Sequence, residues 1–146
     1  MTFFHSCYSK ILIPDTFNWH RDGKTLKLKL AYGYIQECEG VTDDIYHEIS
    51  ECISELRGCY DAESTKYYKN HALTTMMLVD GCALLCYIAS VCLGYCNKYF
   101  NIRYQDIGLL HHDVLLLENQ LPYKLLLRLV QKVSSGAVGF FWMPVF

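Results

Sequence analysis

A single carboxylate, Asp80, is the most conspicuous candidate for chemistry in this sequence, because it stands inside the apolar stretch of residues 71–95. A charge buried without compensation costs several kcal/mol, so Asp80 is expected to be paired, to cap a helix or to be neutral. We favour an ion pair with Arg57 that fixes how two helices meet. The alternative is a catalytic acid or base.

Three consecutive hydrogen-bonding side chains, Glu118, Asn119 and Gln120, stand just before Pro122. At the end of a helix such groups satisfy backbone amides and carbonyls that have no partner within the helix. We therefore predict a buried structural network at this point, and a ligand contact is the alternative.

Two histidines, His111 and His112, precede Asp113 and suggest a metal site. Adjacent residues on a helix point about 100° apart, whereas helical zinc ligands are spaced i, i+3 or i, i+4. We favour a polar helix start that Asp113 caps. A hydrolase-like or metal-binding protein that uses Asp80, Glu118 and the two histidines remains the alternative.

Four of the eight cysteines form two i, i+4 pairs, Cys82 with Cys86 and Cys92 with Cys96. Four thiolates can bind zinc, but the sequence has no Cys-x-x-Cys element and the intervening residues are apolar or small. We predict free thiols buried in a core. The sequence also contains no phosphate-binding glycine loop or nucleophile elbow, so we predict no cofactor and no catalytic residue.

The bulk composition narrows the class of protein. Apolar residues make up 52% of the chain and charged residues 19%, with a formal net charge of -2. The slightly negative net charge argues against a nucleic-acid partner, because binding to phosphate groups depends on a positively charged surface. The first ten residues do not resemble a signal peptide and no glycan acceptor is present, so we expect a cytoplasmic chain.

Hydrophobic periodicity predicts the elements that position these side chains. An amphipathic helix is predicted over residues 43–60, whose buried face includes Ile45, Ile49 and Cys59. Residues 25–30 alternate as a strand would, yet residues 26–37 also fit a helix. The stretch 71–95 is predicted to be helical and divided at Asp80 and Gly81. We favour a core helix there over a membrane span.

Pro122 predicts a sharp joint, with one helix ending near residue 120 and another beginning at the proline. The second helix carries a basic ridge, which we define as Lys124, Arg128 and Lys132. A solvated face is the favoured interpretation of this ridge, and contact with anionic lipid or an acidic partner is the alternative.

Three blocks together resemble the plant family catalogued as domain of unknown function 247. They are Glu-Leu-Arg-Gly-Cys-Tyr at 55–60, Met-Met-Leu-Val-Asp-Gly-Cys at 76–82 and Asp-Val-Leu-Leu-Leu-Glu-Asn-Gln-Leu-Pro at 113–122. Their polar and small residues are Arg57, Cys59, Tyr60, Asp80, Gly81, Cys82, Asp113, Glu118, Asn119, Gln120 and Pro122. A weaker similarity at 20–24 favours a helix for residues 26–37. Two positions depart from the family pattern, which has Glu in place of Cys86 and an apolar residue in place of Lys124.

Together, the pattern and the resemblance predict an all-α, irregular helical domain of about four to six helices. Residues 1–146 are expected to form one partial domain that resembles the N-terminal portion of the family, with an irregular arm over 1–24 and an apolar tail over 137–146 that belongs to a truncated continuation.

The resemblance implies a non-enzymatic interaction or signalling module with an unknown protein partner. Its relatives are plant membrane-associated proteins, some of which, in grasses, are linked to self-incompatibility. Membrane contact is expected only through a C-terminal helix that this chain lacks. The family has no agreed functional residues, so none is transferred to this chain.

Overall fold

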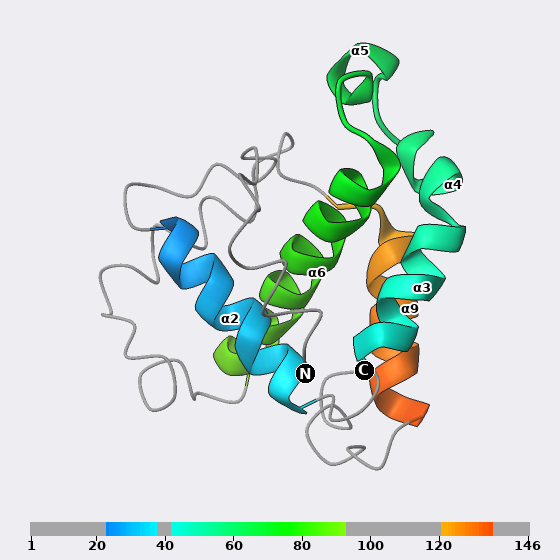
Figure 1. Ribbon diagram of the computed structural model, residues 1–146. Helices are drawn as coiled ribbons and strands as arrows, with labels where there is room; N and C mark the ends of the chain where they lie inside the picture. The colour runs from blue at the N-terminus through cyan, green and yellow to red at the C-terminus, as the bar shows by residue number, and fades with distance from the viewer. Residues whose placement is uncertain (1–22, 38–41, 93–120, 136–146) are drawn as a thin grey trace.

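The described part of the chain, residues 23–37, 42–92 and 121–135 of the computed structural model, is all-α (Figure 1). It contains six helices and, within those ranges, no strand. The helices are α2 (Gly23–Glu37), α3 (Thr42–Glu51), α4 (Ile53–Arg57), α5 (Ala62–Thr65), α6 (Asn70–Cys92) and α9 (Tyr123–Ser135). The predicted fold class is therefore confirmed.

The central element is α6, and residues 73–87 of it are all buried. In the view of Figure 1, α2 lies on one side of α6, while α3, α4 and α9 lie on the other. Residues 70–91 are long and apolar enough to cross a membrane, but 78% of the apolar window is buried inside the protein. The core helix of a soluble protein can be equally long and apolar, so length and composition are weak grounds for assigning a membrane segment here.

The predicted division of this stretch at Asp80 and Gly81 is wrong, because α6 runs through both residues without interruption. A glycine inside a helix costs only about 1 kcal/mol relative to alanine, and the close approach of α9 at Gly81 offsets that cost. The charge of Asp80 is compensated from α2.

The helix predicted for residues 26–37 is confirmed as α2, which begins at Gly23 and so includes the last two residues of the predicted irregular arm. Leu30, Ala31 and Tyr34 are buried, and their spacing of three and four residues follows the period of a helix. The alternation of residues 25–30 is not a strand signal here, because Lys27, which an alternating strand would expose, is buried as well.

The single helix predicted over residues 43–60 is interrupted at Cys52 and ends at Arg57. The backbone bond from Cys59 N to Leu56 O, at 3.1 Å, is of the i to i+3 type and tightens the last turn. As predicted, Ile45 and Ile49 are buried. Cys59 lies beyond the helix and is exposed, which corrects its predicted place on the buried face.

The last predicted helix is confirmed as α9, which begins directly after Pro122. The Pro122 carbonyl accepts from Leu125 N at 2.9 Å, as expected when proline opens a helix. Several predictions fall outside the described residues: the helix cap at Asp113, the network of Glu118, Asn119 and Gln120, the pair His111 and His112, and the tail over 137–146.

Candidate functional site

The carboxylate of Asp80 forms an ion pair with Lys27 of α2, and 2.8 Å separates Lys27 Nζ from Asp80 Oδ1. Both side chains are only 1% exposed. The contact joins a buried cation to a buried anion, so each charge compensates the other in the interior. The predicted partner, Arg57, was therefore wrong, whereas the prediction that Asp80 is paired is correct.

Sequence reasoning missed Lys27, although a signal for it was present. On a helix, Lys27 is three residues before Leu30 and four before Ala31, which places it on the apolar stripe that faces α6. A lysine on that stripe needs a buried counter-charge, because lysine is almost never fully buried unless paired. Asp80, the buried acid of α6, supplies that charge.

Gly81 is where α9 approaches α6. A Cβ atom built on Gly81 would lie 2.4 Å from Leu129 Cδ1 and 3.6 Å from Leu125 Cδ2. Glycine therefore gives these two leucines the space that any larger residue would occupy. Gly81 therefore serves a close helix approach and not the helix break that the sequence predicted.

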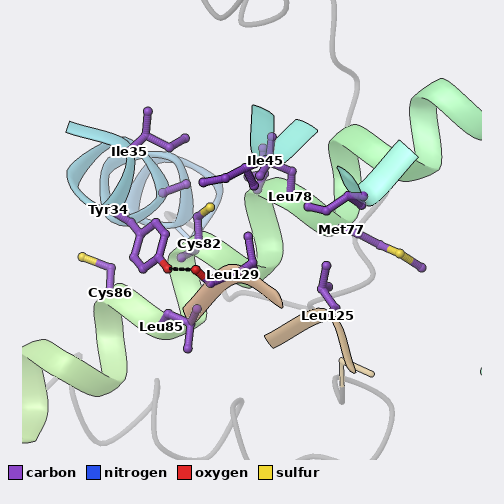
Figure 2. Packing of buried hydrophobic residues seen from close by; sticks show 14 of the residues in the cluster. Tyr34, Ile35, Ile45, Met77, Leu78, Cys82, Leu85, Cys86, Leu125 and Leu129 are labelled. Carbon is purple, nitrogen blue, oxygen red and sulfur yellow. Dashed lines mark hydrogen bonds between the residues drawn. The ribbon is translucent and has the colours of Figure 1, made fainter. Parts of the chain in front are cut away.

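Cys82 follows Asp80 and Gly81 on α6, and its side chain is fully buried. In Figure 2, the hydroxyl of Tyr34 donates a hydrogen bond of 3.0 Å to the carbonyl of Leu129. Cys86, one turn further along α6, is buried too. Both are thiols rather than half-cystines, so the prediction of buried core thiols is confirmed for this pair.

Arg57 acts as a clamp on the turn that leads from α5 to α6. Its Nη1 donates to the Thr65 carbonyl at 2.6 Å, and its Nη2 donates to the Tyr68 carbonyl at 2.7 Å. Nη2 also donates to Oδ1 of Asn70, the first residue of α6, at 3.0 Å. The planar guanidinium thus holds the segment around α5, which lies at the top of the view in Figure 1.

Replacing Arg57 by Met is expected to lower the free energy of unfolding by about 1.5–3 kcal/mol, because charge-assisted hydrogen bonds to backbone carbonyls are lost. Arg57→Lys should recover only part of this loss, since one ammonium group cannot reproduce the fork geometry. Urea denaturation followed by circular dichroism measures both. Equal stability of Arg57→Met and the native chain would contradict the stabilising role assigned to the hydrogen bonds of Arg57.

The side chain of Tyr60 is half-buried. Its burial is the largest cause that raises the pKa of Tyr60 to about 12, and the negative charges of Asp80 and Cys59 contribute in the same direction. The unfolded chain releases this proton near the ordinary tyrosine value of about 10. The stability that Tyr60 contributes is therefore present below about pH 10 and is lost as the pH rises toward 12.

Tyr60→Phe is accordingly expected to lose less stability than the native chain between about pH 10 and 12, because the titrating group is gone. Thermal melts across that range test this sign. The prediction fails if both proteins lose stability in parallel.

Basic and acidic residues form a row of ion pairs between α9 and α3–α4. Glu48 lies 3.2 Å from Lys132 and 3.4 Å from Arg128, and Glu55 pairs with Lys124. The hydrogen bond from Lys124 lowers the pKa of Glu55. The basic ridge is solvent-accessible, as the favoured interpretation expected, and it also contacts acidic side chains of the same chain.

No group of three histidine, cysteine or acidic side chains that could hold a metal ion occurs within the ranges that the structure describes. Of the residues proposed for a metal or hydrolytic site, the structure describes only Asp80, and it places that carboxylate in the interior. It brings Asp80, Gly81 and Cys82 together with Lys27 and Leu129, while Arg57 serves a separate turn.

Residues 18–141 match the model of the family of domain of unknown function 247, described as a plant protein of unknown function. Neither a curated protein nor a solved structure matches the chain.

Proposed function

We propose that this chain, which belongs to the plant family of domain of unknown function 247, is a non-enzymatic helical interaction module. The observation that carries the proposal is the burial of the Lys27–Asp80 pair, with each side chain 1% exposed. A general acid or base must come within hydrogen-bond reach of its substrate. The carboxylate of Asp80 instead compensates a lysine between two helices.

Other residues of the family blocks also have architectural contacts. Arg57 donates to two backbone carbonyls and to Asn70, and Gly81 provides space for Leu129. Side chains committed to such contacts are not available for chemistry unless the structure rearranges. Their arrangement supports a scaffold that presents helical surfaces, and it favours this role over the hydrolase-like or metal-binding alternative.

The same proposal includes a cytoplasmic location and a protein as the partner. The formal net charge of -2 gives no broad basic field for nucleic acid. In addition, the basic ridge is engaged by Glu48 and Glu55.

Metal content and stability of the purified chain test the proposal. We expect no stoichiometric metal by mass spectrometry, and we expect Asp80→Asn to change stability without changing metal content. Glu118→Gln provides the second variant, because Glu118 belongs to the alternative site. Metal near one equivalent that disappears in either variant would overturn the proposal, since bound metal depends on its ligands.

A further inference from the structure

The contact between α9 and the rest of the described fold consists mainly of two buried leucines and a row of surface ion pairs. Among residues 121–132, only the side chains of Leu125 and Leu129 are buried. These leucines pack on Gly81, and Tyr34 donates to the Leu129 carbonyl. We define the α9 docking site as Tyr34, Glu48, Glu55 and Gly81.

We propose that the α9 docking site is a helix-binding site that α9 occupies within the chain, and that a partner helix of the same pattern displaces α9. Binding of an amphipathic helix in an apolar site is a common mode of protein recognition. The inference builds on the proposed interaction role, because it identifies the surface and the kind of partner.

The contacts of α9 define the chemistry of that partner. Leucines spaced i, i+4 pack at Gly81, where the absence of a side chain allows a close helix approach. Three cations, Lys124, Arg128 and Lys132, face the two carboxylates. The first cation directly precedes the first leucine, and the other two follow the first at intervals of four residues. Glu55 pairs with Lys124 and Glu48 with Lys132, so the helix must run antiparallel to α3–α4. The expected partner is a basic amphipathic helix in this orientation.

The ion pairs that hold α9 lie at the surface, where water and salt weaken them. The side chains of Lys124 and Arg128 are 63% and 37% exposed, in contrast to the 1% of Lys27. The outer side of α9 also leaves Tyr123 75% and Leu127 41% exposed. Because only Leu125 and Leu129 are buried among residues 121–132, α9 is expected to open locally at a lower free energy than α2, whose ion pair is buried.

A peptide of residues 121–135, labelled with fluorescein, provides the probe. Its receptor is the full chain carrying Leu129→Ala, which weakens docking of the chain's own α9 but leaves the docking site intact. We expect the peptide to bind this variant at least about tenfold more tightly than it binds the native chain, where α9 competes. If Leu129→Ala does not fold, the double variant Lys124→Glu with Arg128→Glu replaces it, because these changes repel α9 from Glu48 and Glu55.

Two charge reversals provide the matched comparison in the Leu129→Ala background. Glu55→Lys is expected to weaken peptide binding about tenfold or more, because an attraction becomes a repulsion. Glu51→Lys adds the same charge nearby, but the carboxylate of Glu51 lies 3.6 Å from His47 of its own helix. We expect this control to change the affinity less than about twofold, apart from long-range effects that salt screens.

The loosened variants are those in which docking of the chain's own α9 is weakened, namely Leu129→Ala and Lys124→Glu with Arg128→Glu. The proposal is overturned if the peptide binds neither of them, or if Glu51→Lys and Glu55→Lys weaken peptide binding equally. Binding to the native chain and to the loosened variants with one affinity would also overturn it, because α9 would then not compete. These failures are distinct from failure of the proposed function, which depends on metal content.

Discussion

Replacing Lys27 by Met is expected to lower the free energy of unfolding by about 3–5 kcal/mol, the cost of removing one partner from a buried ion pair. The substitution leaves the carboxylate of Asp80 in the interior without its cation, whose Nζ lies 2.8 Å from Oδ1. Asp80→Asn is expected to destabilise by a similar amount, because a buried ammonium group then lacks its counter-charge. Chemical denaturation of both variants provides the measurement.

The double variant Lys27→Met with Asp80→Leu tests whether the charges act as a pair. Replacing a buried ion pair by apolar residues is often close to neutral, so the double variant should be more stable than either single variant. Lys66→Met is the surface control, because the pair of Lys66 with Glu63 is exposed and should contribute less than about 1 kcal/mol. Additive losses in the double variant would contradict a direct coupling.

The contact of Gly81 with Leu129 gives the second large effect. Leu129→Ala is expected to lower the free energy of unfolding by about 2–5 kcal/mol, because a fully buried side chain is truncated. Gly81→Val adds atoms where Leu129 Cδ1 already lies 2.4 Å from a built Cβ, and such overpacking costs about 1–3 kcal/mol.

Combining the two substitutions should cost less than their sum, because the space vacated by Leu129 receives the valine. Gly58→Val is a useful comparison, since a Cβ on Gly58 meets only backbone oxygens of its own segment, the nearest at 3.3 Å. That variant should show no coupling to Leu129→Ala. Denaturant titrations of the set yield the coupling energy directly, and a value near zero for Gly81 with Leu129 would contradict the close approach of α9.

The helices that the sequence predicted well have a strong local signal. In α3 and α9, apolar residues recur at steps of three and four, so the buried face could be identified from each segment alone. For α2 the local pattern was ambiguous, and the resemblance decided the prediction correctly. The ends of helices were less accurate. Nothing in the sequence marks the interruption at Cys52, and Gly58, a residue type that often ends helices, was not used to place the end of α4.

The partners of the candidate site could be predicted only in part, because they depend on contacts between distant segments. Lys27 and Asp80 are 53 residues apart (80 minus 27), and only the packing of α2 on α6 brings them together. The acidic partners of Lys124 and Arg128 were likewise out of reach, since nothing local indicates that α9 lies along α3–α4. Arg57 was assigned to Asp80 by charge alone, whereas its geometry suits nearby carbonyls.

The Asp80-Gly81-Cys82 element has a coherent role in this arrangement. Successive residues on a helix point about 100° apart, so three in a row can meet three different neighbours. Asp80 meets α2 through Lys27, Gly81 meets α9 through Leu129, and Cys82 fills the interior. Each residue type suits its neighbour: a charge for a buried lysine, no side chain for a close helix, and a small apolar thiol for the core.

The most direct test of this account is the accessibility of the thiol next to Asp80 and Gly81. Native protein is treated with N-ethylmaleimide, and modified cysteines are mapped by mass spectrometry over time. Cys59, which is exposed, should react in the native protein, whereas Cys82 and Cys86, which are buried, should react only when denaturant unfolds the chain. Labelling of Cys82 in the native protein as fast as Cys59 would show that this element faces solvent, and it would contradict the architectural role of Asp80.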